Sequence, residues 1–303
     1  MRIGVAATPH VAIPTLDWLL TTSHELALII TQPDRPAGRG RELAQSPVSE
    51  WANTHDITCI KPFSSADLKG VVDDLDLVLT VGYGVLLPEE ILILPRFGFI
   101  NLHFSLLPSY RGAAPVQRAL ENGDLVSGVT VFQLDKGMDT GPVFSQLSID
   151  IESSWRSLEL LEHLAHMGPE ALGQSFDKIA RGIQPEPQVG ESSNAPKISK
   201  DQAEIDWHNS AQVVINKIRA FYPAPCAWSL WNGNPIKITQ AITADIDLKL
   251  TPGQIHFQDN TLFVGAGHSA AIELKSLIPA GKNEMPAADW ARGARLSGGE
   301  NFG

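Results

Sequence analysis

The stretch Ile100-Asn101-Leu102-His103-Phe104-Ser105-Leu106-Leu107-Pro108-Ser109-Tyr110-Arg111-Gly112-Ala113-Ala114-Pro115 decides how this chain folds. Residues 98–100 predict a buried strand, and Pro115 stands where the start of a helix tolerates proline. Core packing does not explain the polar residues between that strand and that helix. Asn101 and His103 are two positions apart, so their side chains project from the same face of an extended chain. The stretch therefore predicts a strand that ends in two polar side chains available for chemistry.

Continuous apolar runs, separated by helical patterns, precede and include this stretch. We expect strands at residues 2–7, 26–31, 57–60, 77–81 and 99–102, and helices at residues 13–20, 65–75 and 88–94. Apolar runs without alternation indicate parallel strands that are covered on both faces. The pattern predicts an α/β domain with a doubly wound parallel sheet, in which functional groups lie at the carboxyl edge of the strands.

A carboxylate joins the two polar side chains from a glycine-rich turn, residues 135–142, that carries Asp139. Residues 128–132 and 143–147 read as paired strands on either side of this turn. Asparagine, histidine and aspartate without a strained Ser or Cys do not make a hydrolase triad. They do suit direct acyl transfer to an amine. Asn101 and a protonated His103 would donate to the oxyanion, while Asp139 orients the ring, raises its pKa and helps to take the proton.

A purely structural interpretation also remains open, in which Asn101 and His103 only satisfy backbone atoms and Asp139 only shapes a turn. Leu106-Leu107-Pro108 forms a stiff apolar turn that suits one wall of a ligand pocket.

The segment 32–41, with Arg35, Arg39 and Arg41, has two interpretations as well. It is either a solvated, mobile connection or a loop that contacts an anionic ligand such as phosphate.

The second half of the chain has a different texture. Residues 157–182 predict a long amphipathic helix that is broken at Gly168-Pro169, and a Pro, Ser, Gly and Glu-rich linker follows. A helix that Ser210 or Asn209 can cap then reaches Phe221. Five short strands within about seventy residues predict a small barrel, most simply of the OB type, closed by a helix over residues 285–294. We expect domains at residues 1–184 and 204–303, joined by a linker at residues 185–203.

Composition limits the class of protein. The 303 residues are 43% hydrophobic and 19% charged, which is ordinary for two globular domains. No apolar run approaches about 20 residues and no signal peptide is evident, so we expect a cytoplasmic protein without a membrane span. Cys59 and Cys226 are isolated, and His163 and His166 lack a third ligand, so we expect no metal. A net charge of −11 argues against indiscriminate nucleic-acid binding but allows a local basic patch.

Two glycine-rich segments are false signals for a dinucleotide site. Residues 265–270 match the G-x-G-x-x-A pattern, but an alternating strand follows them where the motif requires a helix. Gly82-Tyr83-Gly84 lacks the third glycine. We therefore reject a nicotinamide enzyme.

Asn101-Leu102-His103, the Ser-Leu-Leu-Pro of residues 105–108, residues 110–115 and Asp139-Thr140-Gly141 together resemble the folate-dependent formyltransferases. That set is shared by the members that act on glycinamide ribonucleotide or amino sugars. Other segments resemble the branch that acts on methionyl-initiator-tRNA: residues 31–40, 197–207, 218–221 and 279–282. The resemblance covers essentially the whole chain.

This resemblance implies a Rossmann-like catalytic domain and a C-terminal OB-type barrel that binds tRNA. It implies 10-formyltetrahydrofolate as formyl donor, no metal, and the α-amino group of methionyl-initiator-tRNA as acceptor, which gives N-formylmethionyl-tRNA for translation initiation. The catalytic Asn, His and Asp of the family fall on Asn101, His103 and Asp139. Its folate-contacting loop and its tRNA-contacting segment fall on Ser105, Leu106, Leu107 and Pro108, and on Arg39 with Arg35 and Arg41 beside it. We expect a monomer.

Three positions depart from the family pattern: Phe104 is bulkier than usual, Gly82 replaces an alanine, and Asn194 stands where an aromatic residue is commoner. Three alternatives stay open: a formyltransferase for a small amine, a formyltetrahydrofolate hydrolase, and a folate- or RNA-binding protein without turnover.

Overall fold

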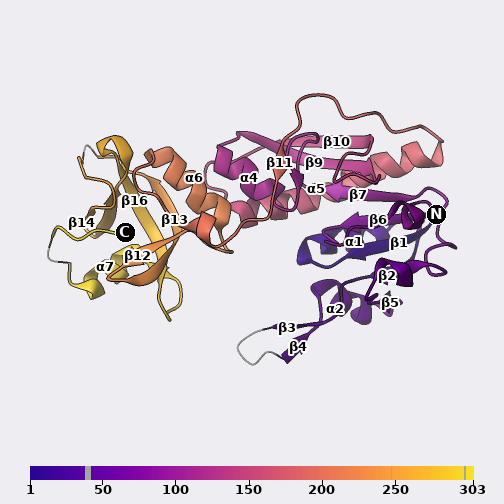
Figure 1. Ribbon diagram of the computed structural model, residues 1–303, viewed down its shortest axis with the longest axis horizontal. Helices are drawn as coiled ribbons and strands as arrows, with labels where there is room; N and C mark the ends of the chain where they lie inside the picture. Colours follow the sequence, from indigo (N-terminus) through magenta and orange to yellow (C-terminus); the bar gives the residue numbers. More distant parts are fainter. Residues whose placement is uncertain (38–41, 247, 297) are drawn as a thin grey trace. The chain divides into compact units, whose positions relative to one another are not determined.

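The apolar runs of the N-terminal part form one seven-stranded sheet in a computed structural model, which describes residues 1–37, 42–246, 248–296 and 298–303. The strand order is β10-β9-β7-β6-β1-β2-β5, shown in Figure 1. Its strands are β1 (Arg2–Ala7), β2 (Glu25–Ile30), β5 (Cys59–Ile60), β6 (Leu77–Val81), β7 (Phe99–His103), β9 (Val126–Gln133) and β10 (Val143–Asp150). The five strands from β5 to β7 are parallel, whereas β9 is antiparallel to both β7 and β10.

This sheet confirms the predicted Rossmann-like class, since the chain order of its parallel strands reverses between β1 and β6. Every residue of β6 is buried, as expected of a strand covered on both faces. The helices of the chain are α1 (Ile13–Leu20), α2 (Pro47–Thr54), α3 (Glu89–Leu92), α4 (Pro115–Asn122), α5 (Ser157–Ala180), α6 (Ala211–Phe221) and α7 (Ala287–Ala294).

Two helix predictions were wrong in detail. Residues 65–75 contain only a 3₁₀ turn, Ser65–Leu68, because Lys69 is extended and Gly70 takes a positive φ of 76°. Helix α5 runs unbroken through Pro169. Its buried stripe is retained on both sides of the proline, and Gly168 lets the helix approach β7, since a Cβ there would lie 2.6 Å from the Leu102 side chain.

Contacts divide the chain into two units. The first comprises Met1–Pro115, Val126–Asp150 and Leu161–Pro196; the second comprises Val116–Leu125, Ile151–Leu160 and Lys197–Gly303. Two segments expected in the N-terminal domain therefore cluster with the C-terminal unit. Arg219 illustrates why, because its guanidinium donates to the carbonyls of Trp155 (2.8 Å) and Glu152 (3.0 Å).

The second unit contains the predicted antiparallel strands. Ser210 caps α6 as expected, accepting from the amide of Val213. The sheet order is β12-β13-β16-β15-β14 with β17 on β16. Its strands are β12 (Trp228–Trp231), β13 (Asn234–Thr243), β14 (Ile255–Gln258), β15 (Thr261–Gly265), β16 (Ala271–Pro279) and β17 (Met285–Pro286).

Residues 300–303 join the two edge strands of this second sheet. Ile255 of β14 donates to the carbonyl of Glu300 (2.8 Å), and Gly303 donates to the carbonyl of Leu230 in β12 (3.1 Å). Between them Phe302 is buried against Trp207, Trp231 and Trp290. The last residues of the sequence thus complete the barrel and fill its interior.

Candidate active site

The carboxyl ends of β6 and β7 bring Thr80 and Asn101 together, since the two residues are paired in the parallel register. The buried Thr80 hydroxyl lies 2.8 Å from Asn101 Oδ1 and donates a hydrogen bond to it. Because the oxygen of the Asn101 amide is engaged in this way, its NH₂ group is the part that remains to donate to a ligand.

His103 is buried at the end of β7, with Nε2 3.0 Å from the carbonyl oxygen of Tyr110. A carbonyl only accepts, so Nε2 carries a proton and the neutral ring has its lone pair on Nδ1. Nδ1 lies 3.8 Å from Asp139 Oδ2.

Burial lowers the pKa of His103, and this outweighs the opposite effects of the Asp139 carboxylate and the Tyr110 carbonyl. This direction favours a neutral ring in the free protein, whereas the sequence suggested a protonated one. Desolvation keeps the imidazole neutral near pH 7, so the ring is ready to accept a proton.

Asp139 lies in a turn that its neighbours close. Asp135 Oδ1 accepts from the amide of Gly137 (2.9 Å) and from the Thr140 hydroxyl (2.7 Å). Asp139 itself has a positive φ of 54°, which aspartate tolerates better than most residues. Its Oδ2 accepts from the amide of Gly112 at 2.7 Å, so the loop that follows β7 holds the carboxylate.

These three side chains line one cavity of about 480 Å³. Its other lining residues come from three segments of the chain: Thr80, Gly82, Tyr83, Gly84, Val85, Leu86, Leu87 and Leu92; Leu102, Phe104, Gly112, Ala113 and Pro115; and Leu134, Asp135, Gly137 and Met138. Sequence reasoning missed the 82–87 segment as part of the site. Its signal was the Gly82-Tyr83-Gly84 run directly after β6, at the same sheet edge as Asn101.

The predicted folate loop, residues 105–108, is not part of the cavity wall. Ser105, Leu107 and Pro108 are buried, and none of residues 105–108 lines the cavity. Thr130 of β9 holds the loop, since its hydroxyl donates to the carbonyl of Ser105 (2.6 Å) and accepts from the amide of Leu107 (3.1 Å). In this arrangement the loop carries the chain back so that the Tyr110 carbonyl meets His103. Folate contact by residues 105–108 stays a prediction.

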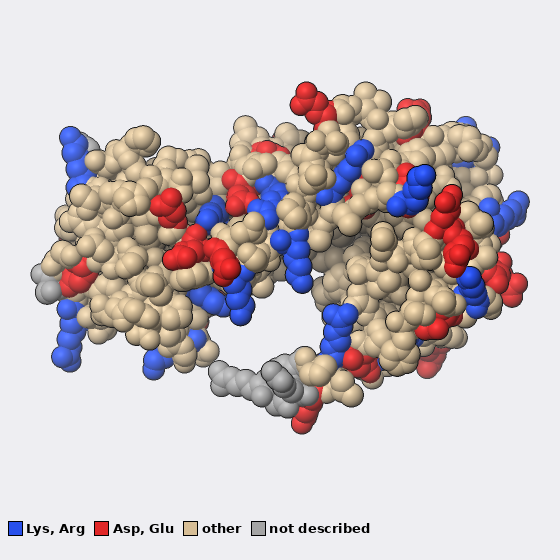
Figure 2. All heavy atoms as spheres, viewed as in Figure 1, with Lys and Arg blue, Asp and Glu red and all other residues tan. Residues whose placement is uncertain are grey.

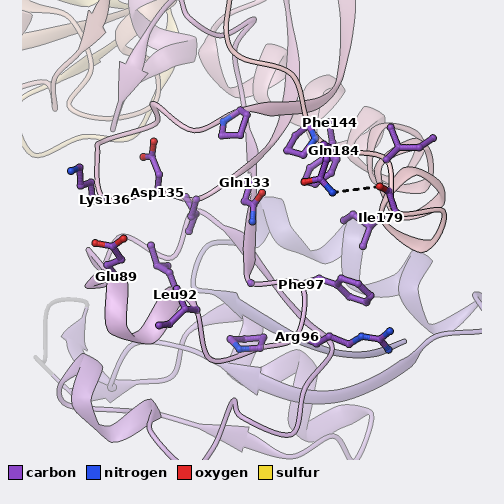
Figure 3. Close-up of a pocket in the computed structure, with 18 residues that line it drawn as sticks. Glu89, Leu92, Arg96, Phe97, Gln133, Asp135, Lys136, Phe144, Ile179 and Gln184 are labelled. Atoms are coloured by element: carbon purple, nitrogen blue, oxygen red, sulfur yellow. Dashed lines mark hydrogen bonds between the residues drawn. The ribbon is translucent and has the colours of Figure 1, made fainter.

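A second cavity of about 670 Å³ adjoins the first and shares Leu92, Leu134 and Asp135 with it. Figure 3 shows Glu89, Asp135 and Lys136 on one side of it and Phe97, Phe144 and Ile179 on the other. Among the described residues, no group of three or more His, Cys, Asp or Glu side chains is arranged to hold a metal ion. The described part of the chain also has no helix long and apolar enough to cross a membrane.

Residues 186–195, which we call the strap, lie against the site although the sequence suggested a linker. Glu186 pairs with Val143 through two backbone hydrogen bonds of 2.7 and 2.9 Å. Ser193 accepts from the amides of both Tyr110 and Arg111 (2.8 Å each). β11 (Asn194–Ala195) then pairs in parallel with β8 (Arg111–Gly112). The strap is thus hydrogen-bonded to the loop that faces His103.

The arginine segment is a two-stranded antiparallel ribbon in its described part, β3 (Arg35–Ala37) and β4 (Glu42–Ala44). Arg35 is exposed, whereas Arg39 and Arg41 lie outside the described residues. The ion pair of Lys61 with Asp34 (2.6 Å) stands at the base of the ribbon. Figure 2 shows lysine and arginine interspersed with Asp and Glu over the face in view.

Comparison with known proteins agrees with this fold. The formyl transferase family model matches residues 1–175, and the model of the formyl transferase C-terminal domain matches residues 197–295. The "Methionyl-tRNA formyltransferase" of Thermobifida fusca is 43% identical, with 100% of this chain and 99% of the relative covered. That of Streptomyces coelicolor is 41% identical over 100% of both chains.

Solved structures share the fold. The methionyl-tRNA formyltransferase of Clostridium thermocellum aligns with a TM-score of 0.58 at 16% identity, covering 81% of this chain and 94% of that chain. The sugar 3N-formyl transferase WlaRD aligns with a TM-score of 0.68 at 19% identity, covering 93% and 99%. HypX from Aquifex aeolicus, in complex with tetrahydrofolic acid, aligns at 0.65 and 17% identity over 96% of this chain and 47% of that chain.

The Rossmann-like sheet, the antiparallel C-terminal sheet and the two family models together define the class: the chain belongs to the formyl transferase family. Within that family, the curated relatives that match it over its full length are methionyl-tRNA formyltransferases.

Proposed function

We propose that the protein transfers the formyl group of 10-formyltetrahydrofolate to the α-amino group of methionyl-initiator-tRNA. The observation that carries this proposal is the meeting of Asn101, His103 and Asp139 in one cavity from two separate segments of the chain. The full-length relatives supply the acceptor, since each is named for methionyl-tRNA. A translation enzyme of this kind belongs in the cytoplasm, and we expect it to act as a monomer.

The cavity lining suits a folate donor. Val85, Leu86 and Met138 are apolar residues of the lining, and Asp135 and Asp139 are polar residues beside them. Ligand sites of this kind are mostly apolar with a few placed polar groups. When bound, the donor supplies an electrophilic formyl carbon, and the residues of this chain hold it and manage charge and protons.

Asn101 donates from Nδ2 to the formyl oxygen as negative charge develops there, a contact that stabilises the transition state more than the ground state. The amine nitrogen bonds to the formyl carbon, the bond from that carbon to the donor nitrogen breaks, and the amine loses one proton. His103 accepts this proton at Nδ1, and the Asp139 carboxylate stabilises the imidazolium. The proton then passes to the departing nitrogen.

The direct test incubates the protein with 10-formyltetrahydrofolate and methionyl-initiator-tRNA, and measures formyl-methionine after deacylation. Asn101→Ala and His103→Ala should each lower kcat by about 10²-fold or more, because their contacts act in the transition state. The same reaction without tRNA measures release of tetrahydrofolate. Rapid release would favour a hydrolase, and formylation of a small amine would favour the sugar or nucleotide branch.

A further inference from the structure

Gln188, on the strap, is hydrogen-bonded to two segments of the site at once. Its Nε2 donates to the carbonyls of Asp139 (2.8 Å) and Gly141 (2.9 Å). Its Oε1 accepts from Arg111, at 3.2 Å from Nε and 2.6 Å from Nη2. The side chain therefore connects the turn that carries Asp139 with the loop that follows β7.

Only an amide satisfies both sides of this arrangement. The two carbonyls require donors, whereas the guanidinium of Arg111 requires an acceptor, and a glutamine side chain has both. An ionised glutamate would still accept from Arg111 but would face the carbonyls of Asp139 and Gly141 with a second acceptor. A polar group left unpaired in this half-buried place costs free energy.

The same two segments also hold the carboxylate. Arg111 directly precedes Gly112, whose amide donates to Asp139 Oδ2 at 2.7 Å. Gln188 therefore restrains the backbone of Asp139 through Nε2. Through Oε1 it restrains Arg111, the residue next to Gly112. The positive φ of Asp139 makes this restraint important, because that backbone conformation persists only where its surroundings hold it.

We propose that Gln188 is a positioning residue, which holds the Asp139 carboxylate toward His103 for formyl transfer; this rests on the proposed function. It does not line the cavity and does not touch the reacting atoms, and it acts through Asp139. A strap residue thereby belongs to the machinery of the site.

The test compares Gln188→Ala and Gln188→Glu with the parent protein in the formylation assay. Both should lower kcat by about 10-fold, the effect expected of misplacing one catalytic group by losing its supporting hydrogen bonds. Gln188→Glu keeps the Arg111 contact and the length of the side chain, so it should stay folded, at some cost in stability, and remain informative if the alanine variant folds poorly. Gln184→Ala is the matched control, because Gln184 bonds the Gly182 carbonyl within its own turn (3.4 Å) and should leave kcat unchanged.

A double-mutant cycle tells positioning from mere stabilisation. If Gln188 acts through the Asp139 carboxylate, Gln188→Ala should cause no further loss in the Asp139→Asn background. The acid limb of kcat/KM should also move to lower pH in Gln188→Ala, as in Asp139→Asn, since Asp139 is the charged group facing the ring among the described residues and raises its pKa.

Equal losses in both backgrounds, an unmoved acid limb, or parent kcat in both Gln188 variants would each overturn the inference. Parent kcat in Asp139→Asn itself would instead count against the proposed catalytic set.

Discussion

The hydroxyl of Thr80 governs one atom of the proposed chemistry, the amide nitrogen of Asn101. Thr80→Val removes the donor to Asn101 Oδ1 and leaves the amide free to turn over. A net hydrogen bond is worth about 0.5–1.5 kcal/mol, so we expect kcat to fall roughly 2–10-fold. Steady-state kinetics with both substrates checks this. Thr80→Ser keeps the hydroxyl and should behave as the parent, and equal rates for all three proteins would exclude a role for Thr80.

We expect the charge of Asp139 to set the acid side of the activity profile. Burial lowers the pKa of His103 and the Asp139 carboxylate raises it, so removing that charge lowers the pKa further. We expect Asp139→Asn to reduce kcat by about 10²–10⁴-fold and to move the acid limb of kcat/KM to lower pH. A parent-like limb with full activity would make Asp139 a turn former only.

Asn101 and His103 could be predicted to share one face at the end of a strand, and Asp139 could be predicted to project from a glycine-rich turn. Their supporting partners could not. Thr80 is one residue of an apolar strand, and Gln188 lies 49 positions after the carbonyl that it contacts. Tyr110 contributes its carbonyl, which every residue carries and no sequence pattern marks.

Among the elements, strands were more predictable than helix ends. Period-two alternation and the Asn232-Gly233 turn located β12 and β13 within a few residues of their bounds. Pro169 suggested a break in α5, but tertiary packing on the sheet outweighed the loss of one helical hydrogen bond. The strap was missed because its Pro, Ser and Gly content describes local freedom and carries no information on its distant partners.

Because residues 300–303 close the barrel, a substitution that removes their packing should measurably lower its stability. Phe302 is 3% exposed, with its ring centroid 5.7 Å from those of both Trp207 and Trp290. Phe302→Ala should lower the free energy of unfolding by about 3–5 kcal/mol, because it removes buried surface and leaves a cavity among the tryptophans. Urea unfolding followed by tryptophan fluorescence measures this. Asn301→Ala, at an exposed neighbour, should change stability little, and an equal effect of both changes would exclude the packing explanation.

For the whole molecule, the difficulty is that an acidic chain of net charge −11 must bind a polyanion. We expect local arginines and lysines to supply the contacts, and Arg35, Arg39 and Arg41 are the densest such cluster in the sequence. Arg219 of the second unit already donates from Nε and Nη2 to the carbonyls of Trp155 and Glu152.

Arg35→Ala and Arg39→Ala should each raise KM for methionyl-tRNA and leave the donor KM unchanged. Each lost phosphate contact should also flatten the dependence of log affinity on log salt by about one unit. Filter binding over a salt series measures the slope. Lys69→Ala controls for the loss of one surface cation, since Lys69 is already paired with Glu90 (2.9 Å). Unchanged slopes in both arginine variants would mean that the ribbon does not contact tRNA.

The position of the strap in the chain also affects the time at which the site is completed during synthesis. Asp139 leaves the ribosome 49 residues before Gln188, a delay of roughly 2–10 s at about 5–20 residues per second. During that interval the nascent sheet can already pair its strands, but the Asp139 turn and the 110–112 loop have no strap to join them. We expect rapid amide exchange in this turn when ribosome-stalled chains end before residue 186. When the chains extend past residue 196 by the length of the exit tunnel, we expect the same amides to be protected from exchange. The cavity lined by Asn101, His103 and Asp139 would then be completed only after most of the unit that contains it has been made.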